Sequence, residues 1–123
     1  MSRRLTQNKG LKMEIQVDSS GSFPVAKITG ELSGTEVERF TDELHEFVAG
    51  QGATLAADLS SLDLIDSQGL AALMNLVTRA RLSGGKVVLV KPSAFVKGIF
   101  HVTRLDTWFD ICDSLEEAEK RLA

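Results

Sequence analysis

The sequence is short of the features that several protein classes need. Its single cysteine, Cys112, has no second thiol for an internal disulfide or a zinc site, which is typical of a reducing compartment such as the cytoplasm. The formal net charge of −3 leaves no basic excess, so we expect no direct binding of nucleic acid. No apolar run approaches the ~20 residues that span a bilayer, so we expect no membrane insertion.

The composition is that of one packed domain. The 123 residues are too few for two domains of ordinary size, and 43% of them are hydrophobic and 25% charged. Residues 1–10 include Arg3, Arg4 and Lys9 and have no apolar core of a signal peptide, so they are expected to form a flexible N-terminal tail. Residues 11–123 are expected to form the domain.

Hydrophobic periodicity predicts strands that alternate with helices. Residues 11–17 alternate apolar and polar side chains, and together with a strand expected over 23–28 they predict an N-terminal hairpin. Helical spacing begins at Thr35, which forms a capping-box pattern with Glu38, and stops at the glycines 50 and 52. Short apolar runs at 54–58 and 86–90 predict buried strands.

Three more helices follow from the pattern. One begins around 66–69 and ends at 83–85, a second opens at Pro92 and Ser93, and a third starts at Ser114, which has a capping-box partner in Glu117. A short edge strand is expected within 108–112. The order of elements predicts an α/β fold, a single layer sandwich with a mixed β-sheet, an N-terminal hairpin and about four α-helices.

The segment 62–70 carries the most informative chemistry. It brings Asp66 and Ser67 to the first turn of a predicted helix, where backbone N–H groups lack partners within the helix and attract acceptors. Either residue suits a helix N-cap, and Gly69 suits a tight turn. Composition alone therefore does not decide whether Asp66 and Ser67 have a structural or a functional role.

The same segment resembles the serine-containing signature of the STAS family of anti-sigma factor antagonists. In that signature an aspartate, a serine, a variable residue, a glycine and a leucine precede an amphipathic helix, as at 66–70 here. Further landmarks of the family occur in the expected order at 30–32, 58–60, 84–85, 92–93 and 103–109. The resemblance extends over residues 13–122.

The resemblance implies a regulatory protein of the cytoplasm that is not an enzyme and needs no cofactor or metal. Its expected partner is an anti-sigma factor with serine kinase activity. Phosphorylation of Ser67 would release that partner, and a PP2C-type phosphatase would restore the unmodified form. Partner switching of this kind regulates transcription without contact with nucleic acid.

Two positions depart from the family pattern. Ser33 stands where an aspartate often follows Gly-Glu-Leu, and Gln68 replaces a second hydroxyl residue, which leaves Ser67 as the acceptor. The expected partner surface combines the loop at Ser33, the rim around Ser67 and the outward side chains of the next helix. Its residues are Ser33, Asp66, Ser67, Gln68, Gly69, Asn75, Thr78 and Arg79.

Three alternatives stay open. The domain can be a STAS subunit that docks on an ABC-type transporter or a sensory assembly without phosphorylation. Ser67 can be the nucleophile of a small hydrolase, although the Gly-x-Ser-x-Gly elbow is absent. Asp58, Asp63 and Asp66 are carboxylates of the kind that binds magnesium, although their spacing matches no calcium loop.

Overall fold

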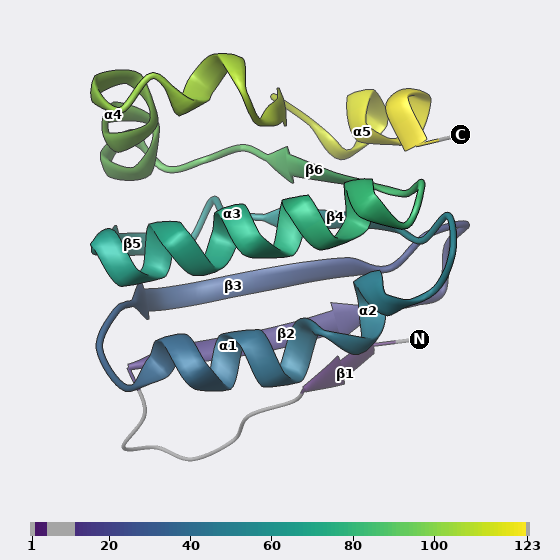
Figure 1. The fold of residues 1–123 in the computed structure, drawn as a ribbon, viewed down its shortest axis with the longest axis horizontal. Coiled ribbons are helices and arrows are strands. Elements are labelled where there is room, and N and C mark those ends of the chain that lie inside the picture. Colours follow the sequence, from purple (N-terminus) through teal and green to yellow (C-terminus); the bar gives the residue numbers. More distant parts are fainter. Residues whose placement is uncertain (1, 5–11, 123) are drawn as a thin grey trace.

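A mixed sheet forms the centre of the fold in this computed structural model, which describes residues 2–4 and 12–122 (Figure 1). The seven strands run in the order β1–β2–β3–β4–β6–β7, and β5 pairs with β3 outside this path. The strands are β1 (Ser2–Arg4), β2 (Met13–Asp18), β3 (Val25–Leu32), β4 (Thr54–Asp58), β5 (Leu62–Ile65), β6 (Lys86–Val90) and β7 (Asp110–Cys112).

Five α-helices and one 3-10 turn accompany the sheet in the described part of the chain. They are α1 (Glu36–Leu44), α2 (Glu46–Ala49), α3 (Ser67–Leu82), α4 (Ala94–Val102), η1 (Leu105–Thr107) and α5 (Leu115–Leu122). In Figure 1, α1 and α3 lie side by side in front of the sheet. The main core fills the space behind them, and a smaller cluster around Ala118 packs α5 onto β4 and β6.

The pairing pattern confirms the predicted mixed sheet with its N-terminal hairpin. β2 and β3 are antiparallel neighbours, whereas β3–β4, β3–β5, β4–β6 and β6–β7 are parallel. Parallel neighbours need crossover connections, which the helices supply. The carboxyl ends of β3 and β5 therefore meet at one edge of the sheet, where β5 leads directly into α3.

A bulge in β3 makes room for β5. The register of the β3–β5 pair shifts between Gly30 and Glu31, and Gly30 has a φ of +100°. A Cβ at Gly30 would also overlap the backbone carbonyl of Lys12. Glycine at this position lets β3 pair first with β4 and then with β5, which carries the chain toward Asp66.

The helix predicted from Thr35 is interrupted at His45 and forms two helices, α1 and α2. The predicted capping box at Thr35 is wrong, because the Thr35 side chain makes no capping hydrogen bond. The buried carboxylate of Glu36 instead accepts the Met13 N–H at 3.1 Å and pairs with Arg39, which itself donates to the Met13 carbonyl at 2.7 Å. A tertiary contact with β2 therefore outweighs the local capping pattern.

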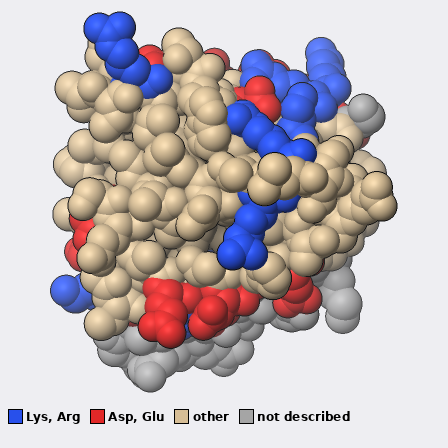
Figure 2. Space-filling model, in the orientation of Figure 1, with Lys and Arg blue, Asp and Glu red and all other residues tan. Residues whose placement is uncertain are grey.

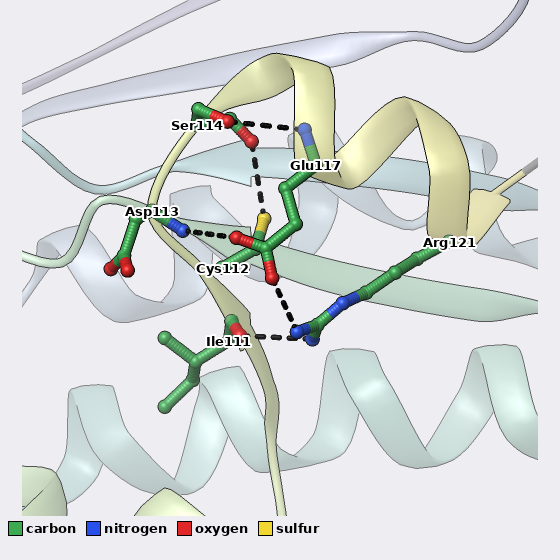
Figure 3. Close-up of polar contacts among 6 residues, drawn as sticks. All are labelled: Ile111, Cys112, Asp113, Ser114, Glu117 and Arg121. Carbon is green, nitrogen blue, oxygen red and sulfur yellow. Dashed lines mark hydrogen bonds and ion pairs between the residues drawn. The ribbon is translucent and has the colours of Figure 1, made fainter.

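Polar contacts join α5 to β7, the C-terminal edge strand, and to the turn between them (Figure 3). The Ile111 carbonyl accepts a hydrogen bond from Arg121 at 2.9 Å, and the Asp113 N–H donates to Glu117 at 3.2 Å. Arg121 and Glu117 pair at 2.7 Å. Of the predicted capping box, the Glu117 N–H bond to the Ser114 hydroxyl is present at 3.1 Å, while the Glu117 carboxylate turns to Asp113.

The N-terminal segment is described in part. Residues 2–4 form β1, an antiparallel neighbour of β2 that the sequence pattern does not predict. The rest of the tail predicted over 1–10 lies outside the described residues, so the flexible tail stays a prediction. None of the helices that the structure describes combines the length and the apolar character needed to cross a bilayer.

Candidate functional site

Asp66 caps α3 and joins it to a second loop. Its backbone is extended, with φ −98° and ψ −177°, and its Oδ1 atom accepts the Gly69 N–H at 2.8 Å. The other oxygen, Oδ2, accepts the Gly34 N–H from the loop between β3 and α1 at 3.2 Å. One carboxylate therefore holds the loop at Ser33–Gly34 against the start of α3.

Ser67 is the first residue of α3 and is exposed. Sequence composition left the N-cap open between Asp66 and Ser67, and the structure assigns it to Asp66. Within the described part of the chain the Ser67 hydroxyl makes no hydrogen bond. The hydroxyl thus faces solvent at a helix N-terminus, where unsatisfied N–H groups favour an added anion.

Gly69 positions this helix start. It is buried, and a Cβ at this position would overlap the Leu32 carbonyl oxygen at the end of β3. The same carbonyl accepts the Asp66 N–H at 3.3 Å. Gly69 therefore acts through close packing of α3 on β3, and it offers no side chain to a partner.

The remaining predicted surface residues fall into two groups. Ser33, which is half-buried, and the exposed Gln68 lie on the two loops that Asp66 connects, beside Ser67. Asn75, Thr78 and Arg79 follow along α3; Asn75 and Arg79 are exposed and Thr78 is half-buried. Twelve residues of helix separate Arg79 from Ser67, about 18 Å at ~1.5 Å per residue.

Sequence reasoning missed two residues of this site. Gly34, with a φ of +55°, presents the N–H that binds Asp66, and only the fold brings the two together across 32 positions of sequence. Leu64 in β5 is 37% exposed, two residues before Asp66. The alternation of Leu62 with Leu64 suggests two buried side chains, but β5 lies outside the main strand order and leaves Leu64 partly uncovered.

The groups required by the hydrolase and metal alternatives lie elsewhere. His45 contacts Arg79 and His101 contacts Asp106, and neither ring is bonded to Ser67. The Asp58 carboxylate accepts two bonds from Ser60, at 3.0 and 2.7 Å. Residues 12–122 contain no group of three or more ligating side chains gathered for a metal ion.

Cys112 is a buried thiol away from this site. Its sulfur donates to the Ser114 carbonyl at 3.3 Å beneath α5 (Figure 3). Burial raises the pKa of the Cys112 thiol above its usual value of 9.0. The neutral thiol is a poor nucleophile, so Cys112 serves as a small core residue.

This mixed sheet, with an aspartate-capped helix that begins at an exposed serine, defines a class of small α/β domain. The STAS domain family model matches residues 14–118, and the chain belongs to that family.

Solved structures share the fold. An anti-sigma factor antagonist from Mycobacterium paratuberculosis is 22% identical, with a TM-score of 0.73, and the match covers 89% of this chain and 93% of that one. Bacillus SpoIIAA in its phosphorylated form is 23% identical, with a TM-score of 0.66 and coverage of 89% and 99%. The murine anion transporter Slc26a9 is 19% identical, with a TM-score of 0.68; the match covers 98% of this chain and 22% of the transporter.

Proposed function

We propose that the protein is a non-enzymatic anti-sigma factor antagonist of the cytoplasm. It binds an anti-sigma factor that is also a serine kinase, and phosphorylation of Ser67 by that kinase switches the binding off. A PP2C-type phosphatase resets the protein. The observation that carries this proposal is the exposed, unbonded hydroxyl of Ser67 at the start of a helix whose cap is supplied by Asp66.

The isolated domain should tolerate a phosphate on Ser67. The group adds about −1.5 to −2 charges at neutral pH, and at an exposed helix N-terminus a negative charge gains about 0.3–1 kcal/mol. No described hydrogen bond of the Ser67 hydroxyl has to break. The fold therefore changes little when the serine is modified.

A complex formed over this rim should not tolerate it. If a partner carboxylate lies about 6 Å from a phosphate of nearly two charges, Coulomb's law at an effective dielectric constant of ~20 gives about 5 kcal/mol of repulsion. A micromolar complex has only ~8 kcal/mol of binding free energy. The local helix-dipole gain is present in the free and bound states and cancels. Repulsion at the interface then decides the switch.

The decisive experiment combines capture of the native partner with titration of variants. The tagged protein is used to capture partners from native lysate, its phosphorylation is mapped, and the purified partner is titrated by calorimetry. Ser67→Ala should bind like the unmodified protein, and Ser67→Asp at least about tenfold more weakly. Ser22→Asp is a matched control, because it introduces the same charge at an exposed serine away from the proposed interface. Ser22 precedes the N-terminal end of β3, whereas the Ser67 site lies at the C-terminal end of that strand. Equal affinity of Ser67→Ala and Ser67→Asp would contradict the proposal.

The same capture experiment tests the second candidate, a STAS subunit docked on an ABC-type transporter or a sensory assembly. The observation that favours this candidate is that a region of the Slc26a9 transporter has a similar fold. Recovery of a transport ATPase or a permease with unmodified Ser67 would support it. Ester turnover that disappears in Ser67→Ala would instead support the hydrolase alternative.

A further inference from the structure

The outer surface of α3 changes character along its length. The helix contains no aspartate or glutamate, and its exposed side chains from Ser67 to Asn75 are uncharged. Two arginines, Arg79 and Arg81, then stand near its C-terminal end, together with Leu82, whose side chain is 82% exposed. We call Arg79, Arg81 and Leu82 the arginine end of α3.

Arg79 is held on the side of α3 that faces α2. Its Nη1 atom lies 3.2 Å from Nδ1 of His45, the residue between α1 and α2. An open hollow of about 340 Å³ adjoins this pair, and its lining is partly apolar. The lining residues are His45, Val48, Ala49, Arg79, Leu82 and Ser83. The hollow has room for a side chain from a partner, next to a guanidinium group.

Arg81 is held on the opposite side of the same helix. Its guanidinium group lies over the Trp108 ring, 4.4 Å from the ring centre, and its Nη2 atom donates to the Trp108 carbonyl at 2.7 Å. Free arginine side chains lose about 2 kcal/mol of rotamer entropy when they are immobilised. Because Arg79 and Arg81 are already positioned, less of this entropy remains to be lost when an acidic group binds.

Basic and acidic side chains concentrate in different parts of this face, with some acidic groups among the basic ones over α5 (Figure 2). Lysine and arginine side chains gather over the C-terminal half of α3 and over α5, and a row of aspartate and glutamate follows the margin beside α1. A basic cluster of this kind is unexpected in a chain of net charge −3. It favours an acidic partner over a general role in solubility.

We propose that the arginine end docks an acidic protein segment that also carries an apolar side chain for Leu82 and the hollow. This inference rests on the proposed function in one respect: it assumes that the acidic segment is part of the same partner that binds at Ser67. About 18 Å of helix separates Arg79 from Ser67, while the Debye length at physiological ionic strength is ~8 Å. Phosphate on Ser67 therefore leaves this contact almost unchanged, and the arginine end serves as an anchor independent of phosphorylation.

Other occupants fit the surface less well. A symmetric contact between two copies centred on the arginine end would set Arg79 and Arg81 of one copy against the same residues of the other. Nucleic acid binding draws on many phosphate contacts, whereas Glu117 and Arg121 on neighbouring α5 are paired with each other. An acidic segment needs only the two positioned arginines.

The molecule contains its own reporter for the test. Trp108 is the only tryptophan, the chain has no tyrosine, and the indole stacks on Arg81. The probe is a short blocked peptide in which glutamate and leucine recur at helical spacing; its control carries lysine in place of glutamate. The glutamate peptide should change Trp108 emission, shift amide resonances of the last turns of α3, and bind more weakly as salt rises. The lysine peptide should do none of these.

Substitutions test whether the peptide binds at Arg79 and Arg81. Arg79→Glu and Arg81→Glu should each weaken binding of the labelled glutamate peptide about tenfold, measured by anisotropy because Arg81→Glu also alters the Trp108 environment. Lys97→Glu, on the exposed surface of α4, makes the same charge change outside the arginine end and should bind like the native protein. Circular dichroism and the amide spectrum check that each variant is folded.

Several outcomes would overturn the inference. One is equal binding of the glutamate and lysine peptides, and another is a set of resonance shifts confined to the Ser67 end of α3. A DNA oligonucleotide of the same charge that binds as tightly as the glutamate peptide would also overturn it. So would a dimer, detected by sedimentation of the native protein, that is lost in Arg79→Glu. None of these measurements uses the kinase or a modified serine. A silent peptide titration beside a working Ser67→Asp switch would remove the anchor alone, whereas a bound peptide beside an inactive switch would remove the proposed function alone.

Discussion

The carboxylate of Asp66 bonds to Gly34 across 32 positions of sequence. Its Oδ2 atom accepts the Gly34 N–H at 3.2 Å while Oδ1 accepts the Gly69 N–H at 2.8 Å. The loop after β3 and the N-terminus of α3 are thereby held together. Because Asp66 performs both tasks, the neighbouring hydroxyl of Ser67 has no capping role.

Substitutions of Asp66 should separate these two tasks. Asp66→Ala removes the cap and the loop contact, and should lower the free energy of unfolding by about 1–2 kcal/mol. Asp66→Asn keeps one carbonyl oxygen for the cap but loses the second acceptor, and should cost about 0.5–1 kcal/mol. Urea unfolding monitored by circular dichroism measures both. Equal loss in the two variants would mean that the capping bond to the Gly69 N–H contributes nothing.

Glycine substitutions should act in opposite directions at two helical positions. Gly69→Ala forces a methyl group against the backbone carbonyl of Leu32 and should destabilise the fold by about 1–3 kcal/mol. Gly98→Ala is the matched control, since Gly98 lies in α4 with no atom within 4 Å of a new Cβ. It should stabilise by about 0.5–1 kcal/mol through reduced freedom of the unfolded chain. Similar losses at both positions would refute the packing role of Gly69.

Leu64 should matter more for partner binding than for stability. Its side chain is 37% exposed beside Asp66, whereas Leu62 in the same strand is fully buried. Leu64→Ser should cost less than about 1 kcal/mol of stability but weaken the captured partner about tenfold. Leu62→Ala, in contrast, should cost about 2–5 kcal/mol. Unchanged calorimetric affinity of Leu64→Ser would place Leu64 outside the interface.

The Asp18 carboxyl should titrate at unusually low pH. The hydroxyl and then the backbone N–H of Ser20 donate to it, at 2.7 and 2.9 Å, and lower its pKa from 3.8 to about 2. Because the folded pKa lies below the unfolded one, the stabilisation is complete above the unfolded value and is lost as the pH falls through about 2. An NMR titration of the carboxyl carbon measures the midpoint. Ser20→Ala should move that midpoint upward, and a native midpoint near 3.8 would contradict the bonding scheme.

Periodicity was sufficient for the elements whose burial repeats regularly. The β2–β3 hairpin and α3 follow the predicted pattern because their apolar residues recur at strand or helix spacing and face one core. Periodicity was insufficient where a contact with a residue far away in the sequence determines the local structure. The helix from Thr35 is interrupted at His45, and Glu36 bonds to β2, a contact that a local capping rule does not include.

In the candidate site, too, some residue roles follow from the local sequence and others do not. The order aspartate, serine, glutamine, glycine placed a helix start at 66–69 and identified Ser67 as its hydroxyl, since local spacing and residue type are sufficient for both. Composition did not distinguish Asp66 from Ser67 as the cap, and the expected partner surface included Gly69, which is buried.

Those assignments depend on groups that are far apart in the chain. The Gly34 N–H and the Leu32 carbonyl reach α3 only after β3 and β5 pair in parallel, and their positions determine which oxygen is bonded and which position must lack a Cβ. The arrangement of Arg81 on Trp108 is likewise tertiary. Helix and strand periods are local properties of the chain, whereas hydrogen-bond partners and exposed surfaces are set by packing between distant segments.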